Sequence, residues 1–274
     1  MTLFDQFSLA GRSALVTGGA SGLGLAYVEA VAEGGAAVTI ADIDGGAAAA
    51  EAERLRNAGF DVRHCQVDVA DDDAVRRAFD DHEAAFGAID VVFANAGMAA
   101  GEGYLGFDGR RTVSGQIDVY AVDDWRKTLA IDLDGVFFTF RHAVRLMKKH
   151  GRKGSLIATT SNASEITCPI VPTPYMPAKA GVRHFVRQLA RELAGYGIRV
   201  NAIAPGSVVT NIGGGVLHDP AVRAVWDQGV PLGRMGEPRQ FKALALYLAS
   251  DASDFMTGAE LLVDGGVSLR GIDG

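Results

Sequence analysis

The sequence predicts a single α/β domain in which a doubly wound, seven-stranded parallel sheet is flanked by helices. Three observations support this prediction. Short apolar runs alternate with longer helical patterns along the chain, a glycine-rich turn follows the first run, and no Pro/Gly/Ser-rich linker divides the 274 residues. Apolar strands that alternate with helices form a parallel sheet, because the crossover helices cover both of its faces. One domain over residues 1–274 is therefore expected.

Each predicted strand is a short apolar run that ends at polar or turn residues. The runs are 13–16, 38–41, 62–67, 89–94, 155–160, 199–204 and 260–263. Helices are expected at 47–57, which contains an alanine run, and at 72–86, which opens with Asp72 and Asp73. The cations of 148–153 are expected to close a helix, because positive charge is favourable at a helix C-terminus.

Two long connections interrupt this alternation. Residues 98–122 form a glycine-rich insertion, and residues 207–234 contain a helical pattern at 220–228. Long connections at the ligand edge of such a sheet usually carry function. We expect the first to narrow the entrance of a site or to make subunit contacts, and the second to act as a substrate lid. A surface insertion without function is the alternative for the first.

Composition excludes several classes of protein. Hydrophobic residues make up 48% of the chain and charged residues 22%, which is typical of a globular protein with a sizeable core. A net charge of −7 argues against nucleic-acid binding. No apolar run is long enough for a bilayer and no signal-peptide pattern opens the chain, so a cytoplasmic protein without a membrane partner is expected. Two distant cysteines and six scattered histidines suggest neither disulfides nor a metal site.

The turn after the first strand has the pattern of a phosphate-binding loop. Gly18, Gly22 and Gly24 form G-x-x-x-G-x-G, and Ser21 and Leu23 lie between them. Glycines let the backbone turn tightly and let a pyrophosphate approach free N–H groups at the positive end of the next helix. We therefore expect these five residues to bind a dinucleotide in a Rossmann-type fold. A tight turn that binds nothing is the alternative, since the chain has 35 glycines.

Asp42 ends the second predicted strand, 18 residues after Gly24. A carboxylate at this position accepts the hydroxyl hydrogens of an adenosine ribose and repels a 2′-phosphate, so it selects NAD over NADP. No Lys or Arg occurs in 18–24 to pair with such a phosphate. The alternative is an aspartate that only caps a helix or a turn, because Asp44 and Gly45 follow.

Tyr175 and Lys179 are four residues apart, which puts both on one face of a helix. A tyrosine pKa of about 10 is too high for a base at neutral pH. A neighbouring ammonium and a positive nicotinamide ring favour the phenolate, so we expect a lowered pKa for Tyr175. Such a tyrosine takes a proton from an alcohol as hydride leaves, or gives one to a carbonyl as hydride arrives. An ordinary surface pair is the alternative.

With these residues in place, the chain resembles the short-chain dehydrogenase/reductase family in its roughly 250-residue form. The motifs cover nearly the whole chain in the family's order. They are the glycine turn, Asp68-Val69, Asn95-Ala96-Gly97, Ser161, Tyr175-x-x-x-Lys179, Pro205-Gly206 with Thr210, and Asp264-Gly265-Gly266.

The resemblance implies a role for each motif. Ser161 would hold and polarise the substrate oxygen, Tyr175 would be the acid/base, and Lys179 would bind the nicotinamide ribose, lower the tyrosine pKa and relay protons. The other implied cofactor-binding residues are Asp68 and Val69 at the adenine, Asn95, Ala96 and Gly97 at the cofactor floor, and Pro205, Gly206, Val208 and Thr210 around the carboxamide. The implied activity is that of an NAD-dependent alcohol dehydrogenase or ketone reductase, in a homotetramer or dimer.

Three positions depart from the family pattern. Asp132 stands where the motif N-L-x-G has asparagine; aspartate keeps the backbone role, but a buried carboxylate is expected to shift the pH profile. The interval from Ser161 to Tyr175 is one residue longer than usual, which leaves Asn162 as an alternative to Ser161. Pro177 lies inside the Tyr–Lys motif, so the helix is expected to begin near Tyr175.

The residues expected around the substrate are mostly apolar. They are Met98, Ile166, Cys168, Ile170, Val171, Pro172, Val216, Leu217 and Trp226. They predict a small-molecule substrate, a secondary alcohol or ketone on a hydrophobic or cyclic skeleton. The alternatives are a dihydrodiol dehydrogenase of the same family and a non-catalytic NAD-binding or scaffold protein, which Asp132 alone favours. An enoyl reductase would space its tyrosine and lysine more widely.

Overall fold

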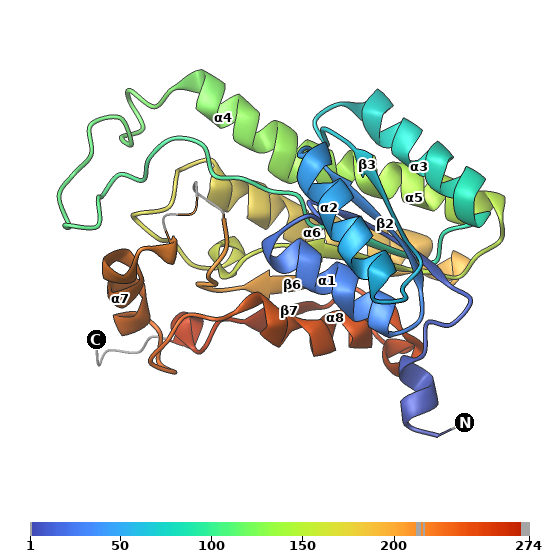
Figure 1. Ribbon diagram of the computed structural model, residues 1–274. Coiled ribbons are helices and arrows are strands. Elements are labelled where there is room, and N and C mark those ends of the chain that lie inside the picture. Colours follow the sequence, from blue (N-terminus) through green and yellow to red (C-terminus); the bar gives the residue numbers. More distant parts are fainter. Residues whose placement is uncertain (1, 212–214, 216, 270–274) are drawn as a thin grey trace.

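A seven-stranded parallel sheet forms the middle layer of the computed structural model, which describes residues 2–211, 215 and 217–269 (Figure 1). The strands lie in the order β3-β2-β1-β4-β5-β6-β7. Their bounds are β1 Ser13–Thr17, β2 Ala37–Asp42, β3 Val62–Gln66, β4 Val91–Ala94, β5 Ser155–Thr159, β6 Arg199–Pro205 and β7 Glu260–Val263. The strand order reverses between β1 and β4, which places a ligand crevice at their carboxyl ends. The predicted fold class is confirmed.

Helices cover both faces of this sheet (Figure 1). They are α1 Gly22–Glu33, α2 Gly45–Asn57, α3 Asp72–Phe86, α4 Val122–Leu129, α5 Gly135–Lys149, α6 Tyr175–Leu193, α7 Pro220–Gln228 and α8 Lys242–Ala249. One apolar core packs α1, α2 and α8 on the sheet through side chains such as Tyr27 and Leu248. A second core packs α3, α5 and α6 on the other face, with Phe79 and Phe140 fully buried.

The central strands explain why the apolar runs were informative. Every residue of β1, β4 and β5 is buried, because helices lie above and below them. Strands that are covered on both faces read as continuous apolar runs rather than as alternating ones. The edge strands β3 and β7 are more exposed, and their sequences are correspondingly more polar or shorter.

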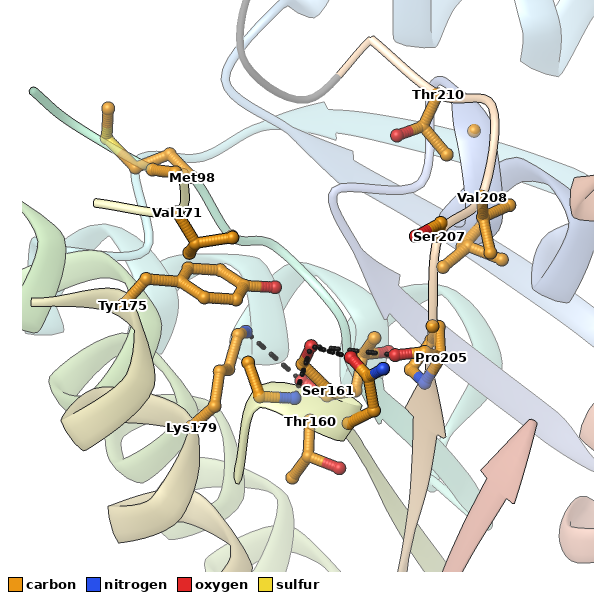
Figure 2. Close-up of a pocket in the computed structure, with 18 of the residues that line it drawn as sticks. Met98, Thr160, Ser161, Val171, Tyr175, Lys179, Pro205, Ser207, Val208 and Thr210 are labelled. Atoms are coloured by element: carbon orange, nitrogen blue, oxygen red, sulfur yellow. Dashed lines mark hydrogen bonds between the residues drawn. The ribbon is translucent and has the colours of Figure 1, made fainter. Parts of the chain in front are cut away.

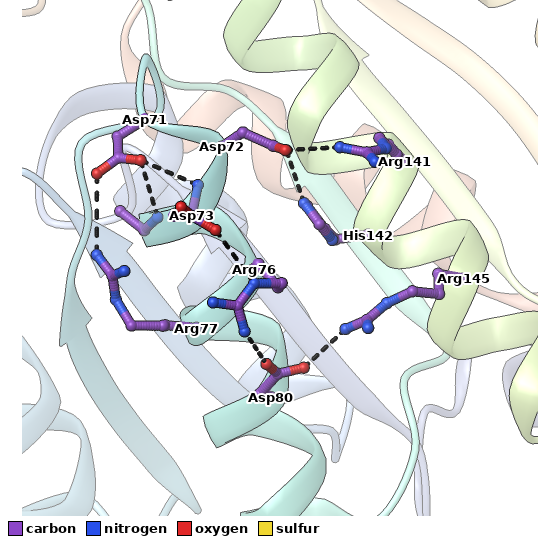
Figure 3. A network of polar contacts seen from close by, with 10 residues as sticks. Asp71, Asp72, Asp73, Arg76, Arg77, Asp80, Arg141, His142 and Arg145 are labelled. Carbon is purple, nitrogen blue, oxygen red and sulfur yellow. Dashed lines mark hydrogen bonds and ion pairs between the residues drawn. The ribbon is translucent and has the colours of Figure 1, made fainter.

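Charged side chains join α3 to α5 across the surface of one helical layer (Figure 3). Asp72 lies 2.6 Å from an Nη of Arg141 and 2.7 Å from Nε2 of His142. Asp80 lies between Arg76 of its own helix, at 3.0 Å, and Arg145 of α5, at 2.7 Å. The exposed arginine–aspartate pairs contribute only about 0–1 kcal/mol each. The apolar core beneath them is therefore the main contact that holds α3 and α5 together.

The predicted helix ends agree with the structure. The helix α6 begins at Tyr175, with Pro177 in its first turn, where proline costs no hydrogen bond. The helix α5 closes on Lys148 and Lys149. The insertion carries no helix before α4, and its Leu105 and Arg111 form an isolated antiparallel bridge. Within the described ranges, no helix is both long and apolar enough to cross a bilayer.

Candidate active site

The glycine turn between β1 and α1 is packed too tightly for any side chain. Gly18 and Gly22 have φ angles of +62° and +53°, a region that L-residues with side chains seldom adopt. A Cβ atom at Gly24 would overlap the carbonyl oxygen of Gly18 and lie 2.6 Å from Nδ2 of Asn95. Among the described residues, Ser21 makes no side-chain cap on α1. The first N–H groups of α1 are therefore available to an anion.

Asn95 fixes this turn from the end of β4. Its Nδ2 donates to the carbonyl oxygens of Thr17, at 3.2 Å, and Gly18, at 3.1 Å. Its Oδ1 accepts from the hydroxyl of Thr159 at 3.0 Å. One amide side chain thus links the carboxyl ends of β1, β4 and β5, which explains why asparagine suits a position with so many partners.

Asp42 is held in a fixed orientation at the carboxyl end of β2. Its Oδ2 accepts from the backbone N–H of Ala20 at 2.9 Å, and its Oδ1 accepts from that of Asp44 at 3.0 Å. The carboxylate lines the crevice next to Ile43 and Asp68. The two backbone bonds leave further acceptor sites on both oxygens for a ligand.

A single cavity of about 1060 Å³ connects the glycine turn with the substrate end. Nearly all of the residues predicted for the cofactor and the reaction line it. They are Gly18, Ser21, Gly22, Leu23, Asp42, Asp68, Val69, Asn95, Ala96, Gly97, Ser161, Tyr175, Lys179, Pro205, Gly206, Val208 and Thr210. Gly24 is the exception, because it packs beneath the turn instead of facing the cavity. The dimensions and the free N–H groups fit a dinucleotide.

Tyr175 and Lys179 lie together on the first turn of α6 and face this cavity. The Lys179 Nζ is 5.4 Å from the centroid of the Tyr175 ring. Figure 2 shows the Tyr175 hydroxyl directed into the space between Ser161 and the segment from Pro205 to Thr210. The phenol of Tyr175, the ammonium of Lys179 and the hydroxyl of Ser161 thus lie together at one end of the cavity.

Ser161 follows β5 directly and is 8% exposed. Its Oγ accepts from the backbone N–H of Ala163 at 3.1 Å, and it also lies within donor range of Asn162 Oδ1, at 3.4 Å, and Pro205 O, at 3.5 Å. Ser161 also acts as a side-chain hydrogen-bond partner that lowers the pKa of Tyr175. Asn162 lines the same cavity, but its side chain turns to Ser161 rather than to the tyrosine.

Asp132 forms a buried ion pair with Lys179. Its Oδ1 is 2.8 Å from Lys179 Nζ, and the two side chains are 0% and 3% exposed. The contact is an ion pair rather than a well-aligned hydrogen bond. The other oxygen, Oδ2, accepts from the backbone N–H of Met98 at 3.1 Å, while Lys179 Nζ donates to the carbonyl of Thr159 at 3.2 Å.

The local backbone presents this carboxylate to the site. Asp132 lies in a π-helical turn, Ala130–Asp134, between α4 and α5. Such turns are rare and often occur at functional sites, since they rotate a side chain out of the regular helical position. A Cβ atom at Gly97 would lie 2.8 Å from Asp132 Oδ1 and 3.2 Å from Lys179 Nζ. Gly97 thus closes over the ion pair, which excludes water from it.

The pKa of Tyr175 is raised in the chain alone, not lowered as the Tyr–Lys spacing predicts. Burial of the hydroxyl is the largest cause, and the negative charge of Asp132 adds to it. The charge of Lys179 and the hydrogen bond with Ser161 lower the pKa, but they do not outweigh burial and the charge of Asp132. Burial lowers the pKa of the Lys179 ammonium, but Asp132 and Tyr175 raise it by more, so the pKa is raised overall.

Three segments surround the substrate end of the cavity: the insertion, the loop after β5, and α7. The backbone N–H of Leu105 in the insertion donates to the carbonyl of Pro169 at 3.0 Å. Phe107 meets Trp226 of α7 edge to face, with ring centroids 6.2 Å apart. The insertion and α7 therefore touch at the cavity, which both rings line.

The predicted substrate-pocket residues converge on this end. Lining the cavity are Met98, Ile166, Cys168, Ile170, Val171, Pro172, Leu217 and Trp226. Val216 lies outside the described residues. Sequence reasoning missed Phe107, Lys127, Met235, Val267 and Ser268, which also line it. These residues lie in irregular segments or on exposed helix faces, so no motif or periodic pattern in the sequence marks them.

Comparison with known proteins gives a consistent result. A family model described as Enoyl-(Acyl carrier protein) reductase matches residues 18–268. The chain is 38% identical to sorbose reductase SOU1 of Candida albicans, over 96% of this chain and 89% of that protein. It is 39% identical to cis-4-hydroxycyclohexanecarboxylate dehydrogenase of Sinomonas cyclohexanicum, over 94% of this chain and 97% of that protein.

A solved structure agrees with these matches. The gluconate 5-dehydrogenase of Burkholderia cenocepacia J2315, in complex with NADP and tartrate, superposes with a TM-score of 0.86 and is 36% identical; the match covers 98% of this chain and 100% of that one. The glycine cradle, the sheet order and the Tyr–Lys pair agree with this relationship. The chain therefore belongs to the short-chain dehydrogenase/reductase family, whose members are nicotinamide-dependent oxidoreductases.

Proposed function

We propose that this chain is an NAD-dependent dehydrogenase that interconverts a secondary alcohol and a ketone on a hydrophobic or cyclic skeleton. The hydroxyl of Tyr175, which opens into the cavity near Ser161 while the Lys179 ammonium lies beside the ring, carries this proposal. A phenol in such a place can transfer a proton to or from a substrate oxygen.

The proposed division of labour follows from the contacts of each side chain. Ser161 holds the substrate oxygen, because its Oγ lies in the cavity and the backbone N–H of Ala163 fixes its position. Tyr175 takes the hydroxyl proton of an alcohol, or gives one to a ketone. A bound nicotinamide supplies the hydride acceptor and a positive charge. The substrate binds where both hydroxyls reach its oxygen, so that charge developing there is stabilised as it forms.

Lys179 positions this chemistry instead of exchanging the substrate proton itself. Its ammonium is anchored by Asp132 and by the carbonyl of Thr159, and both contacts keep it charged and fixed below the tyrosine ring. A fixed positive charge favours the phenolate. Lys179 also lines the cavity, where its ammonium would donate to a ribose hydroxyl of the cofactor.

NAD is the proposed cofactor because of the charges around the adenosine end. Asp42 presents a carboxylate held by two backbone N–H groups. Of the described lining residues, the only cations are Lys127 and Lys179, which belong to the substrate end. A 2′-phosphate would meet like charge at Asp42 with no cation to offset it, which costs several kcal/mol. The related gluconate 5-dehydrogenase was crystallised with NADP. Initial rates with NAD and NADP therefore test the choice directly.

The proposed skeleton follows from the wall of the substrate end. Met98, Ile170 and Val171 present apolar surface around the Tyr175 hydroxyl, and the ring contact between Phe107 and Trp226 lies above it. We propose that the insertion and residues 207–234 close over a bound substrate. An apolar skeleton gains free energy when it is buried against this part of the wall.

A homo-oligomer that buries α5 and α6 is also proposed. Phe137 is 45% exposed on α5, and its ring lies 6.1 Å from that of Phe185 on α6. Phe185 is partly buried, so the two rings present one exposed and one half-buried aromatic face, which is the kind of surface that a partner can cover. Light scattering of the purified chain gives the mass that tests this.

The central experiment measures NADH formation with a panel of secondary alcohols. The Tyr175→Phe variant should lose about 10²- to 10⁴-fold in turnover, the usual contribution of a general acid/base. Tyr196→Phe is the matched control, since Tyr196 is exposed and remote from the cavity. Turnover of Tyr175→Phe equal to wild type would disprove the assignment. Binding of NAD without turnover of any alcohol or ketone would favour a non-catalytic protein on the same fold.

A further inference from the structure

One positive charge in the cavity has no part in the proposed reaction. The described cavity wall carries four charged side chains, namely Asp42, Asp68, Lys127 and Lys179. The two aspartates lie at the ends of β2 and β3, on the adenosine side of the glycine turn. The charge of Lys179 is partly offset by its ion pair with Asp132. Lys127 is the remaining cation.

The position of Lys127 on α4 places it at the substrate end. Lys127 and Ile131 are one helical turn apart and both line the cavity, so this face of the helix fronts it. Residues 98–101 run along the same helix: the N–H of Met98 bonds Asp132, and that of Ala100 lies 3.4 Å from the hydroxyl of Thr128. Lys127 lies five residues before Asp132, which corresponds to roughly 7 Å along the helix axis.

Lys127 makes no ion pair within the described part of the chain. This is informative because Asp123 and Asp124 precede it by four and three residues, the two spacings at which helical ion pairs form. Neither aspartate lines the cavity. The lysine shares its stretch of wall with Met98, Ala99 and Ile131, which offer it no side-chain acceptor. Lys127 is exposed to solvent, and a cation beside this apolar stretch of the wall favours an anion that enters with the substrate.

We propose that the substrate carries a carboxylate that pairs with the ammonium of Lys127 while its carbinol carbon lies at Tyr175 and Ser161. This inference rests on the proposed dehydrogenase function and narrows it to hydroxy acids and keto acids. The carboxylate and the reacting carbon stand apart on an apolar skeleton, because Lys127 and Tyr175 come from different elements on the cavity wall. The pair fixes which hydroxyl of a substrate meets the tyrosine, so Lys127 is a specificity-determining residue.

The kinetic test compares one carboxylate with its neutral isostere. The probes are 4-hydroxycyclohexanecarboxylate and 4-hydroxycyclohexanecarboxamide, each oxidised with NAD by wild type, Lys127→Gln and Lys127→Arg. Wild type should favour the acid, and Lys127→Gln should raise KM for the acid about tenfold, as expected for the loss of one charge-assisted contact, with kcat unchanged. Lys127→Arg should retain the preference. Arg126→Gln is the matched control, because Arg126 precedes Lys127 on α4 but does not line the cavity.

A binding measurement separates this inference from the proposed function. Titration calorimetry with cyclohexanecarboxylate, which has no hydroxyl to oxidise, should detect binding to the wild-type chain with NAD and about tenfold weaker binding to Lys127→Gln. If this holds but no alcohol is oxidised, the proposed function fails and the anion site stands. Equal affinity of wild type and Lys127→Gln for the carboxylate overturns the inference. An equal loss with the carboxamide overturns it as well, because it would show a structural role only.

Discussion

The Asp132→Asn substitution is the most direct probe of the buried pair beneath the tyrosine. It removes one negative charge but keeps the shape of the side chain and an oxygen that still accepts from the N–H of Met98. Two properties should change together, the stability of the fold and the pH at which the enzyme begins to oxidise an alcohol.

The expected change in stability follows from the geometry of the pair. Opposite charges 2.8 Å apart attract by about 6 kcal/mol at an effective dielectric constant near 20. Desolvation of each buried ion costs several kcal/mol, so the intact pair contributes little net stability. Breaking it leaves the Lys179 ammonium buried without a counter-charge, which costs about 3 kcal/mol even with the amide oxygen as a partner. Urea denaturation at neutral pH measures this loss.

The loss of stability has a defined pH dependence. The pKa of Lys179 is raised in the folded chain. A raised lysine pKa contributes stability that is fully present below the unfolded value of about 10.4 and disappears as pH rises through the folded value. The difference between wild type and Asp132→Asn should therefore be constant around neutral pH and shrink in strong alkali.

The same substitution should lower the stability of the fold but make Tyr175 easier to deprotonate. Asp132 is one cause of the raised pKa of Tyr175, so its removal lowers that pKa. Oxidation of an alcohol needs the phenolate, and the acidic limb of kcat/KM should move to lower pH; each unit of movement corresponds to about 1.4 kcal/mol. Asp134→Asn is the matched control, because Asp134 lies in the same π-helical turn but is exposed. A limb that stays in place, or moves to higher pH, would refute the electrostatic reasoning.

Three further substitutions test the cradle, the cofactor choice and the roof of the cavity. Gly24→Ala should abolish NAD binding in calorimetry and lower the melting temperature, because its Cβ would overlap the carbonyl oxygen of Gly18; normal binding would contradict the packing. Asp42→Ala should reduce the preference for NAD over NADP by about tenfold or more, measured as the ratio of kcat/KM values; an unchanged ratio would remove Asp42 from the recognition of the ribose. Phe107→Ala should raise KM for cyclic substrates several-fold without a loss of kcat, since it opens the ring contact with Trp226. Val113→Ala, at a side chain that is 74% exposed on the same insertion, should leave KM unchanged, and equal effects of the two changes would argue against a roof.

The sequence was most informative where local and tertiary requirements coincide. All seven strands were predicted to within a few residues, because burial on both faces demands continuous apolar runs. The glycine turn could be predicted for a related reason. Gly18 and Gly22 have positive φ angles, and the close contact at Gly24 leaves no room for a Cβ atom, so all three positions favour glycine. The Tyr175–Lys179 spacing needed only a helix to bring the two side chains together.

Features of the site that depend on contacts between distant segments could not be predicted from local sequence patterns. Phe107 and Lys127 look like ordinary residues of a loop and of an exposed helix face, and only the tertiary fold brings them to the cavity. The Tyr–Lys spacing by itself predicts a lowered tyrosine pKa. Whether burial outweighs the lysine charge depends on how completely other segments cover the ring, which no local pattern reveals.

Asp132 shows how one departure from a motif changes the electrostatics of a whole site. Sequence comparison identified the aspartate, but its partner was visible only once the π-helical turn had placed it against Lys179. With a neutral side chain there, the lysine charge would act on Tyr175 undiminished. With the carboxylate, part of that charge is cancelled, and burial keeps the phenol protonated in the chain alone. In the proposed mechanism, deprotonation of Tyr175 then depends on positive charge that an oxidised cofactor would bring into the cavity, so we expect the tyrosine to accept a proton only when that cofactor is bound.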